Sequence, residues 1–233
     1  MLQAVIFDMD GVIIDSHPAH REAWRTFLRT VGKIVTDTEL DFVLDGRKRG
    51  DILRHFLGEL SEDEIREYGD RKDSFFRKAA LRVKLIPGVV DLLDSLREAA
   101  IATAVATSAS ESRCWHVLEQ VQLAEKFGVI VTGNDVSKGK PDPAIYRLTC
   151  RQLKVKPEST LAVEDAISGI QAARGAGLTC IGVASHQSPE KLRSAGAACV
   201  VENFLGLSLA SLKVLLPSRS RRASPSRALT GAR

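Results

Sequence analysis

Two carboxylates stand directly after the first apolar run of the chain, in Ala4-Val5-Ile6-Phe7-Asp8-Met9-Asp10-Gly11. A continuous apolar run is typical of a strand buried in a parallel sheet, and ligands bind where such strands end. Two acids at that place repel each other unless a cation or a shared proton lies between them. One carboxylate can attack phosphorus as a nucleophile, and a second, beside a flexible glycine, can act as general acid and base. Asp8 and Asp10 therefore predict a metal-assisted reaction site.

Two hydroxyl residues, Thr107 and Ser108, follow another apolar run at Ala102–Ala106. Hydroxyls and backbone N–H groups at the end of a strand, where a helix begins, suit the oxygens of a phosphate group. A Ser or Thr that caps the following helix explains the pair equally well. The two residues therefore become informative only beside the other candidates.

A lysine occupies a rigid turn in Ser137-Lys138-Gly139-Lys140-Pro141-Asp142-Pro143. Gly139 permits close approach of the backbone, and the two prolines fix the chain after the lysine. Lys140 can supply a point charge to a phosphoryl group and to the nucleophile. Lys138 is the neighbouring alternative, and Lys140 is preferred because it directly precedes the turn.

A second acidic pair, Glu164-Asp165, ends the apolar run Thr160–Val163. Carboxylate oxygens select hard cations, and Mg²⁺ is usually held by one or two carboxylates together with waters and a substrate phosphate. Either acid alone is uninformative. A magnesium-dependent site is predicted by the three strand ends together, which bear Asp/Asp, Thr/Ser and Glu/Asp. Lys140 lies between the last two of these strand ends in the sequence.

Short apolar runs alternate with amphipathic stretches, which predicts an α/β fold with a parallel sheet. Helices are expected at about 89–99, 111–122, 142–153, 167–175, 189–195 and 206–216. The expected strands are Ala4–Phe7, Ala102–Ala106, Val129–Val131, Thr160–Val163, Thr179–Val183 and Ala198–Val200.

A helical block interrupts this alternation and predicts a cap over the strand ends. Helices are expected at His20–Val31, Asp37–Leu44, Arg49–Leu60 and Ser61–Leu81. Two of their starts, at Thr36 and Ser61, offer a capping side chain with a glutamate three residues later. We therefore predict a Rossmann-like core at 1–15 and 86–216, a helical cap at 16–85, and a disordered basic tail at 217–233.

Composition limits the possible partners. The net charge of +4 includes five arginines after residue 217, and without those five it is −1, so no nucleic-acid surface is expected on the core. No apolar stretch reaches the roughly 20 residues of a membrane span, and the first is too short for a signal sequence. We expect a soluble, cytoplasmic monomer whose cysteines are reduced and largely buried: Cys114, Cys150, Cys180 and Cys199.

These motifs, in this order, resemble those of the haloacid dehalogenase superfamily over about residues 2–205. The resemblance implies a Rossmann-like core, Mg²⁺ and an aspartyl-phosphate intermediate. It implies that Asp8 is the nucleophile and a metal ligand. Asp10 would be the acid/base, with its carbonyl on the metal, and Glu164 and Asp165 would complete the metal site. Dehalogenases, which act on carbon, lack the second aspartate, so phosphoryl transfer is favoured.

A narrower resemblance is to β-phosphoglucomutase and related sugar-phosphate phosphatases, and it concerns the cap. The segment Asp15-Ser16-x-x-x-His20-x-x-Ala23-Trp24 resembles the cap entry of that subgroup, and Gly46-Arg47-Lys48-Arg49-x-Asp51 resembles its phosphate-contacting loop. Arg71-Lys72-Asp73 resembles a later cap segment whose lysine faces the site. By this likeness His20, Arg49 and Lys72 join Ser108 as candidate substrate-binding residues, although Arg47 and Lys48 make the choice of Arg49 ambiguous.

The sequence leaves phosphatase and mutase activities nearly balanced. In Ala109-Ser110-Glu111 it lacks the polar and basic groups with which the mutase pattern holds a second phosphate. This difference favours hydrolysis of a small phosphorylated metabolite, such as a sugar phosphate. An inactive binding protein of the same fold is a third interpretation, but it is disfavoured because Asp8, Asp10, Lys140 and Asp165 are all present.

Overall fold

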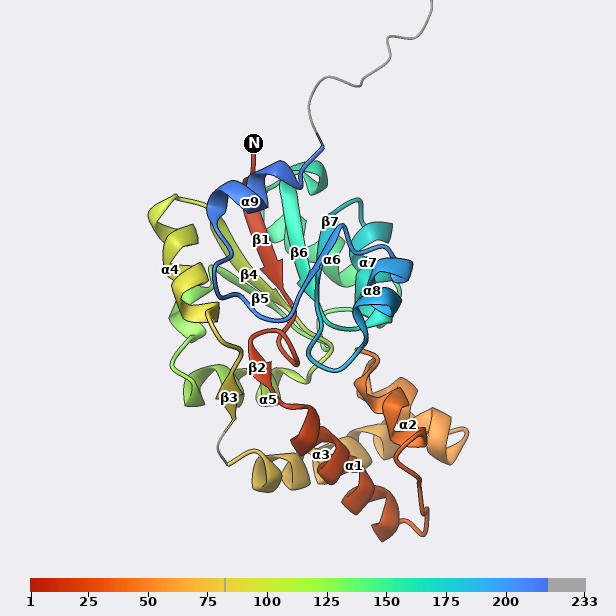
Figure 1. Ribbon diagram of the computed structural model, residues 1–233. Helices are drawn as coiled ribbons and strands as arrows, with labels where there is room; N and C mark the ends of the chain where they lie inside the picture. Colours follow the sequence, from red (N-terminus) through yellow and green to blue (C-terminus); the bar gives the residue numbers. More distant parts are fainter. Residues whose placement is uncertain (82, 218–233) are drawn as a thin grey trace, which may run out of the picture.

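The computed structural model describes residues 1–81 and 83–217, and its centre is a six-stranded parallel sheet. The strand order is β5-β4-β1-β6-β7-β8, so the first strand lies in the middle with β4 and β6 on either side (Figure 1). Phe7 is in register with Val105 and Val163. The residues that follow these strands therefore meet at one edge of the sheet. The strands are β1 (Ala4–Phe7), β4 (Ala102–Ala106), β5 (Val129–Val131), β6 (Thr160–Glu164), β7 (Thr179–Val183) and β8 (Cys199–Val201).

Helices cover both faces of this sheet, which explains why its strands are apolar throughout. Val5 and Phe7 of β1 belong to one buried cluster and Ile6 to the other, as the alternation of side chains along a strand requires. On the first face lie α4 (Val89–Glu98), α5 (Glu111–Gln120) and α9 (Leu209–Val214), and on the second α6 (Ala144–Leu153), α7 (Ile167–Gly175) and α8 (Pro189–Ala195).

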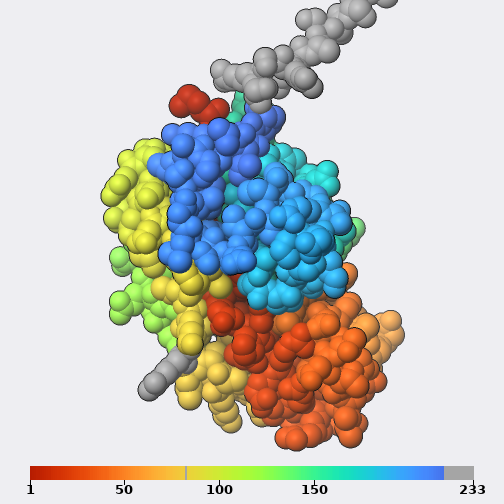
Figure 2. Space-filling model, in the orientation of Figure 1, coloured from red at the N-terminus to blue at the C-terminus, as the bar shows by residue number. Residues whose placement is uncertain are grey.

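The cap has its own apolar core, formed around Trp24, Phe27 and Leu53. On the face shown in Figure 2, the atoms of the cap abut those of the sheet domain. A capping box at Ser61, whose hydroxyl and backbone N–H bond reciprocally with Glu64, begins the longest helix. The elements of the cap are α1 (His17–Thr30), the 3-10 helix η1 (Glu39–Leu44), α2 (Arg49–Leu57) and α3 (Glu62–Ala79).

A small antiparallel pair, β2 (Ile14–Asp15) with β3 (Lys84–Leu85), joins the two parts of the molecule. The chain enters the cap after β2 and leaves it before β3, so the two crossings lie side by side (Figure 1). Ile86 N–H also donates to Ile13 O at 3.0 Å. The sequence did not predict this pair because two-residue strands show no period of hydrophobicity.

The predicted α/β class and all six core strands are confirmed, and the other differences concern the type of one helix and the ends of others. The segment predicted as a helix at Asp37–Leu44 is a 3-10 helix, the form that short helical pieces commonly take. The first cap helix begins at His17 rather than His20, because Pro18 suits a first turn. The helix predicted at 206–216 spans only Leu209–Val214, where Ser208 caps it.

Other expectations concern the cysteines, the tail and the membrane. All four cysteines are free thiols, and three of them are buried. The basic tail falls on residues 218–233, which lie outside the described part of the chain. Among the described residues no helix has the length and apolar character needed to cross a membrane.

Candidate active site

The ends of β1, β4 and β6 bring together the residues predicted for chemistry. Asp8 follows β1, Thr107 follows β4, and Glu164 and Asp165 stand at the end of β6. All four side chains are buried, with Asp8 6% exposed and Glu164 0% exposed. Asp8, Thr107 and Asp165 line the same small cavity.

Lys140 is the cation at the centre of this acidic cluster. Its Nζ donates hydrogen bonds to Asp8 Oδ1 and Glu164 Oε1, both at 2.6 Å, and to Ala106 O at 3.0 Å. Burial alone would lower the pKa of Lys140, but the two carboxylates raise it above its usual value. Lys138 is exposed, so the structure distinguishes the two lysines. Lys140 is therefore a fixed positive charge beside Asp8.

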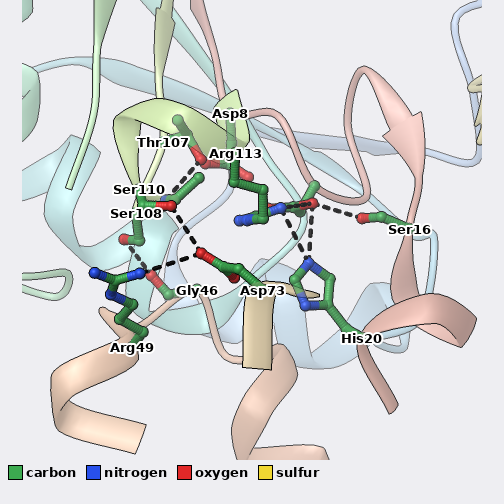
Figure 3. Close-up of polar contacts among 12 residues, drawn as sticks. Asp8, Ser16, His20, Gly46, Arg49, Asp73, Thr107, Ser108, Ser110 and Arg113 are labelled. Atoms are coloured by element: carbon green, nitrogen blue, oxygen red, sulfur yellow. Dashed lines mark hydrogen bonds and ion pairs between the residues drawn. The ribbon is translucent and has the colours of Figure 1, made fainter. Parts of the chain in front are cut away.

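Asp10 points to a different set of partners. Ser16 Oγ donates to its Oδ1 at 2.7 Å, and His20 Nε2 lies 3.1 Å from the same atom. The Arg113 guanidinium binds both oxygens, Nη1 to Oδ1 at 3.0 Å and Nη2 to Oδ2 at 2.7 Å (Figure 3). Burial would raise the pKa of Asp10, but Arg113 and His20 hold it well below its usual range. Asp10 is therefore ionised in this arrangement.

Arg113 is a residue of the site that sequence reasoning missed. It belongs to α5 of the core, is 6% exposed, and lines the cavity. No motif marks it. A signal was nevertheless present, because Arg113 stands one turn before Val117 on the apolar face of its helix, where a charged residue is out of place. A buried arginine there needs an acidic partner, which the structure identifies as Asp10.

Two cap residues predicted to bind substrate, His20 and Lys72, form a hydrogen-bonded series with Asp10. Lys72 Nζ lies 3.3 Å from His20 Nδ1, while the other ring nitrogen of His20 faces Asp10. Burial, with the charge of Lys72, lowers the pKa of His20 to about 3, so the ring is neutral. Burial also lowers the pKa of Lys72 to about 8. A neutral His20 that donates to Asp10 through Nε2 accepts from Lys72 through Nδ1.

Arg49 also lines the cavity, but it is paired with acids. Its Nη1 lies 3.2 Å from both Asp70 Oδ1 and Asp73 Oδ2. Asp73, whose role the sequence did not suggest, accepts in addition from Ser110 Oγ of the core at 2.9 Å (Figure 3). Asp73 thus links two cap helices to the start of α5.

The cap loop at residues 45–48 contacts the core directly. Ser108 Oγ donates to Gly46 O at 2.7 Å, so in this arrangement the Ser108 hydroxyl is bonded to the cap. Lys48 Nζ donates to Val136 O at 2.8 Å and does not line the small cavity, whereas Arg47 and Arg49 do. Ser168 Oγ hydrogen-bonds to Asp45 O. These contacts describe a cap closed on the core.

The acidic cluster fits a hard cation. Asp8, Glu164 and Asp165 each offer an oxygen within 4.8 Å of the others. Burial and the neighbouring carboxylates raise the pKa of Asp8, with Lys140 opposing them, and a further cation would relieve this repulsion. Glu164 lies deeper than the other two and does not line the cavity. Its Oε1 accepts from Tyr146 at 2.6 Å, while its buried Oε2 has no partner in the described structure.

The closed cap leaves little room at the reaction centre. The cavity has a volume of about 60 Å³, well below the roughly 300–1,000 Å³ of typical ligand pockets. A second cavity of about 410 Å³ adjoins it between α2 and the core, and the two share Arg49, Ser108, Ala109 and Ser110. We call this second cavity the access groove. Its wall includes four basic side chains, Lys48, Arg49, Arg54 and Arg66, against two acidic ones, Asp51 and Glu62.

Comparison with known proteins places the chain in a family. Residues 5–183 match the family described as Haloacid dehalogenase-like hydrolase. The chain is 32% identical to the Phosphorylated carbohydrates phosphatase of Thermotoga maritima over 86% of this chain and 94% of the relative, and 30% identical to the Beta-phosphoglucomutase of Bacillus subtilis over 80% and 85%. The structure of CbbY from Rhodobacter sphaeroides in complex with xylulose-(1,5)bisphosphate covers 91% of this chain and 99% of its own, with a TM-score of 0.78 and 30% identity. The chain therefore belongs to the haloacid dehalogenase-like hydrolases.

Proposed function

We propose that this enzyme hydrolyses a small phosphorylated metabolite, most simply a sugar phosphate, through a phosphoryl group carried on Asp8. The observation that carries this proposal is the contact of Lys140 with Asp8 at the end of β1, in a cavity that Thr107 and Asp165 also line. A buried carboxylate held by a fixed ammonium group, with hydroxyl and backbone donors nearby, suits nucleophilic attack on a phosphoryl group.

In the first half of the reaction Asp8 attacks phosphorus. Lys140 occupies Oδ1, and no described residue hydrogen-bonds to Oδ2, so Oδ2 forms the new P–O bond. The P–O bond to the metabolite breaks, and its oxygen takes a proton from Asp10. Before this step Asp10 must lose its contact with Arg113 and take up a proton. The pKa of Asp10 is well below the usual range while the guanidinium is bound.

In the second half a water molecule attacks the phosphorus atom of the aspartyl phosphate. Asp10, now ionised, accepts a proton from that water, and the bond between phosphorus and Asp8 breaks to release inorganic phosphate. Asp10 is then protonated, and it can bind Arg113 again once it has released that proton to solvent. His20 and Ser16, which both contact Oδ1, keep Asp10 near the site throughout.

Asp8 and Asp165, with the backbone carbonyl of Asp10, are the groups that would hold Mg²⁺. Glu164, which lies deeper than these two side chains, would add negative charge near the ion. When bound, the ion neutralises charge on the transferring phosphoryl oxygens. Lys140 lies between Glu164 and Asp8 and donates a hydrogen bond to each. Its positive charge offsets the repulsion between the two carboxylates and so keeps the cluster ordered.

The cations of the site favour a substrate with a second anionic group. Arg49, Lys72 and Arg113 all line the cavity, and Arg49 also lines the access groove. The segment Ala109-Ser110-Glu111 was expected to disfavour a second phosphate, but its acidic residue, Glu111, is exposed and lines neither the cavity nor the groove. Among the relatives, CbbY was solved with a bisphosphate.

The same cations keep a β-phosphoglucomutase-type reaction as the second candidate. A mutase returns the phosphoryl group to a sugar hydroxyl instead of water, and it must hold each phosphate of a bisphosphate in turn. With Glu111 outside the cavity, the described residues place no carboxylate of α5 against such a bisphosphate.

A panel of phosphorylated sugars, assayed with and without Mg²⁺, tests the proposal. We expect magnesium-dependent phosphate release that exceeds any interconversion of β-glucose 1-phosphate and glucose 6-phosphate with a bisphosphate primer. Mutase turnover faster than hydrolysis would replace the first proposal with the second. Absence of both reactions would contradict the two together.

A further inference from the structure

Two histidines from different elements converge on Asp165 beside the reaction centre. His17 is the first residue of α1, and His186 lies in the loop after β7. His17 Nε2 is 2.9 Å and His186 Nδ1 is 3.2 Å from the same carboxylate oxygen, Oδ2 of Asp165. The two rings are tilted against each other, with centroids 4.2 Å apart. The cap and the segments that follow β6 and β7 thus each contribute one side chain to a compact cluster.

Three of the four imidazole nitrogens of this cluster have no hydrogen-bond partner in the described protein. His17 Nδ1 and both ring nitrogens of His186 are buried without a hydrogen-bond partner, and the approach of His186 to Asp165 lacks hydrogen-bond geometry. The side chains are 9% and 13% exposed. A buried polar group left unpaired costs about 1–3 kcal/mol, so such a group usually has a water or an ion as its partner.

We propose that His17, Asp165 and His186 form a second cation site, selective for a divalent transition metal such as Zn²⁺. Two imidazoles and one carboxylate suit Zn²⁺, Co²⁺ or Ni²⁺ far better than Mg²⁺, which prefers oxygen ligands. Ligand atoms at about 2.0–2.2 Å from a tetrahedral ion lie roughly 3.3 Å apart. The separation of His186 Nδ1 from Asp165 Oδ2, 3.2 Å, is close to that value and that of His17 Nε2, 2.9 Å, is somewhat shorter, while the three ligand atoms all lie within 4.8 Å of one another.

The carboxylate of Asp165 divides its oxygens between the two sites. His17, His186 and Ser185 all contact Oδ2, while no described residue hydrogen-bonds to Oδ1. Oδ1 is therefore left for the magnesium site beside Asp8. A Cβ atom at Gly11 would lie 2.0 Å from Asp165 Oδ2 and 2.4 Å from His17 Cε1, so the absence of a side chain there makes room for the cluster. The second site is thus separate from the first but adjoins it through one shared residue.

Cobalt is a suitable probe because its visible absorption reports the ligands and geometry of the site. The full chain is titrated with Co²⁺ in excess Mg²⁺, which fills the carboxylate site, and Zn²⁺ is then added. We expect one equivalent of Co²⁺ to bind with the intense visible bands of a nitrogen-containing tetrahedral site, and Zn²⁺ to displace it. No stoichiometric binding in the presence of Mg²⁺ would overturn the proposal.

Variants separate this site from adventitious binding by other histidines. His186→Gln and His17→Gln should each weaken Co²⁺ and Zn²⁺ affinity at least tenfold, with folding checked by circular dichroism. His116→Gln, which changes an exposed histidine of α5, is the matched control and should bind like the parent. Equal affinity in the parent and both cluster variants would contradict the proposal and would assign the unpaired nitrogens to water. None of these readouts depends on phosphatase activity.

Discussion

Asp10 is held by a bidentate arginine in the same cavity where it is expected to donate a proton. The Arg113 guanidinium keeps the carboxylate ionised, so a general acid has to be released from its partner before it can work. An anionic group on the substrate is the natural competitor for Arg113. We therefore expect Arg113 to couple binding of that group to the availability of Asp10.

Arg113→Gln should reduce discrimination between substrates. Loss of a charge-assisted hydrogen bond costs about 1.5–3 kcal/mol, which corresponds to about 10- to 100-fold. We expect kcat/KM for a sugar bisphosphate to fall by that factor relative to kcat/KM for p-nitrophenyl phosphate, which has no second anionic group. Arg113→Lys should restore part of the difference. An unchanged ratio in both variants would show that Arg113 is purely structural.

Lys72 provides a pH dependence of substrate binding. Burial lowers the pKa of Lys72 to about 8, so the side chain is charged below that pH and loses its charge above it. The KM for an anionic substrate should therefore rise as the pH increases beyond about 8. Lys72→Arg keeps its charge throughout this range and should remove the rise. The same alkaline rise in both proteins would contradict this role for Lys72.

At the scale of elements, the tight turn after β1 places the two aspartates differently. Gly11 has φ +73°, and its N–H donates to Ile14 O at 2.8 Å, which reverses the chain just beyond the strand. Asp8 is left against Lys140 while Asp10 is carried towards the cap. The positive φ and the closeness of Asp165 both require glycine at this position.

Gly11→Ala should nearly abolish turnover, by more than about 100-fold, because the added Cβ would displace Asp165. Gly32→Ala is the matched control. Gly32 has φ +77° but nothing within 4 Å of the added atom. The control should lose about 1–2 kcal/mol of stability from backbone strain yet keep its kcat. Steady-state kinetics and thermal unfolding of both variants give the comparison, and equal kcat in the two would refute the steric argument.

The sequence predicted the elements that have a clear hydrophobic pattern. It missed the shortest elements and the residues whose roles depend on partners elsewhere in the chain. The core strands were found because a strand buried on both faces is a continuous apolar run. The β2–β3 pair was missed because two residues carry no period, and η1 was taken for an α-helix because both share a helical pattern. Strand-end motifs predicted Asp8 and Asp165, and the rigid turn before Pro141 predicted Lys140. Arg113 was marked only by its place on the apolar face of α5, and the partners that give Arg113, Asp73 and His186 their roles are distant in sequence.

At the scale of the whole molecule, the cap and the core enclose a cavity that is too small for a sugar phosphate. Its volume of about 60 Å³ is well below the roughly 300–1,000 Å³ of typical ligand pockets. The cap must therefore move away from the core when substrate enters, and the two chain crossings at the antiparallel pair β2 and β3 are where such a movement can be accommodated. Closure would then exclude water from the first half of the reaction.

The access groove should attract anionic substrates through its basic wall. Arg66→Glu, at the groove, is expected to lower kcat/KM about three- to tenfold at low ionic strength, and high salt should remove the difference because it screens exposed charges. Arg29→Glu, which changes an exposed arginine near the far end of α1, should have no such effect. Equal salt dependence in both variants would argue against entry through this groove.

The central claim, that Asp8 carries the phosphoryl group, is tested most directly by phosphate release from Asp8→Asn in saturating Mg²⁺. The amide keeps the shape of the side chain but lacks the nucleophilic carboxylate. We predict that turnover falls to the background rate while circular dichroism and thermal unfolding show a folded protein. Asp15→Asn, at an exposed position on β2, should retain the parent rate. Full phosphate release by Asp8→Asn would contradict the account.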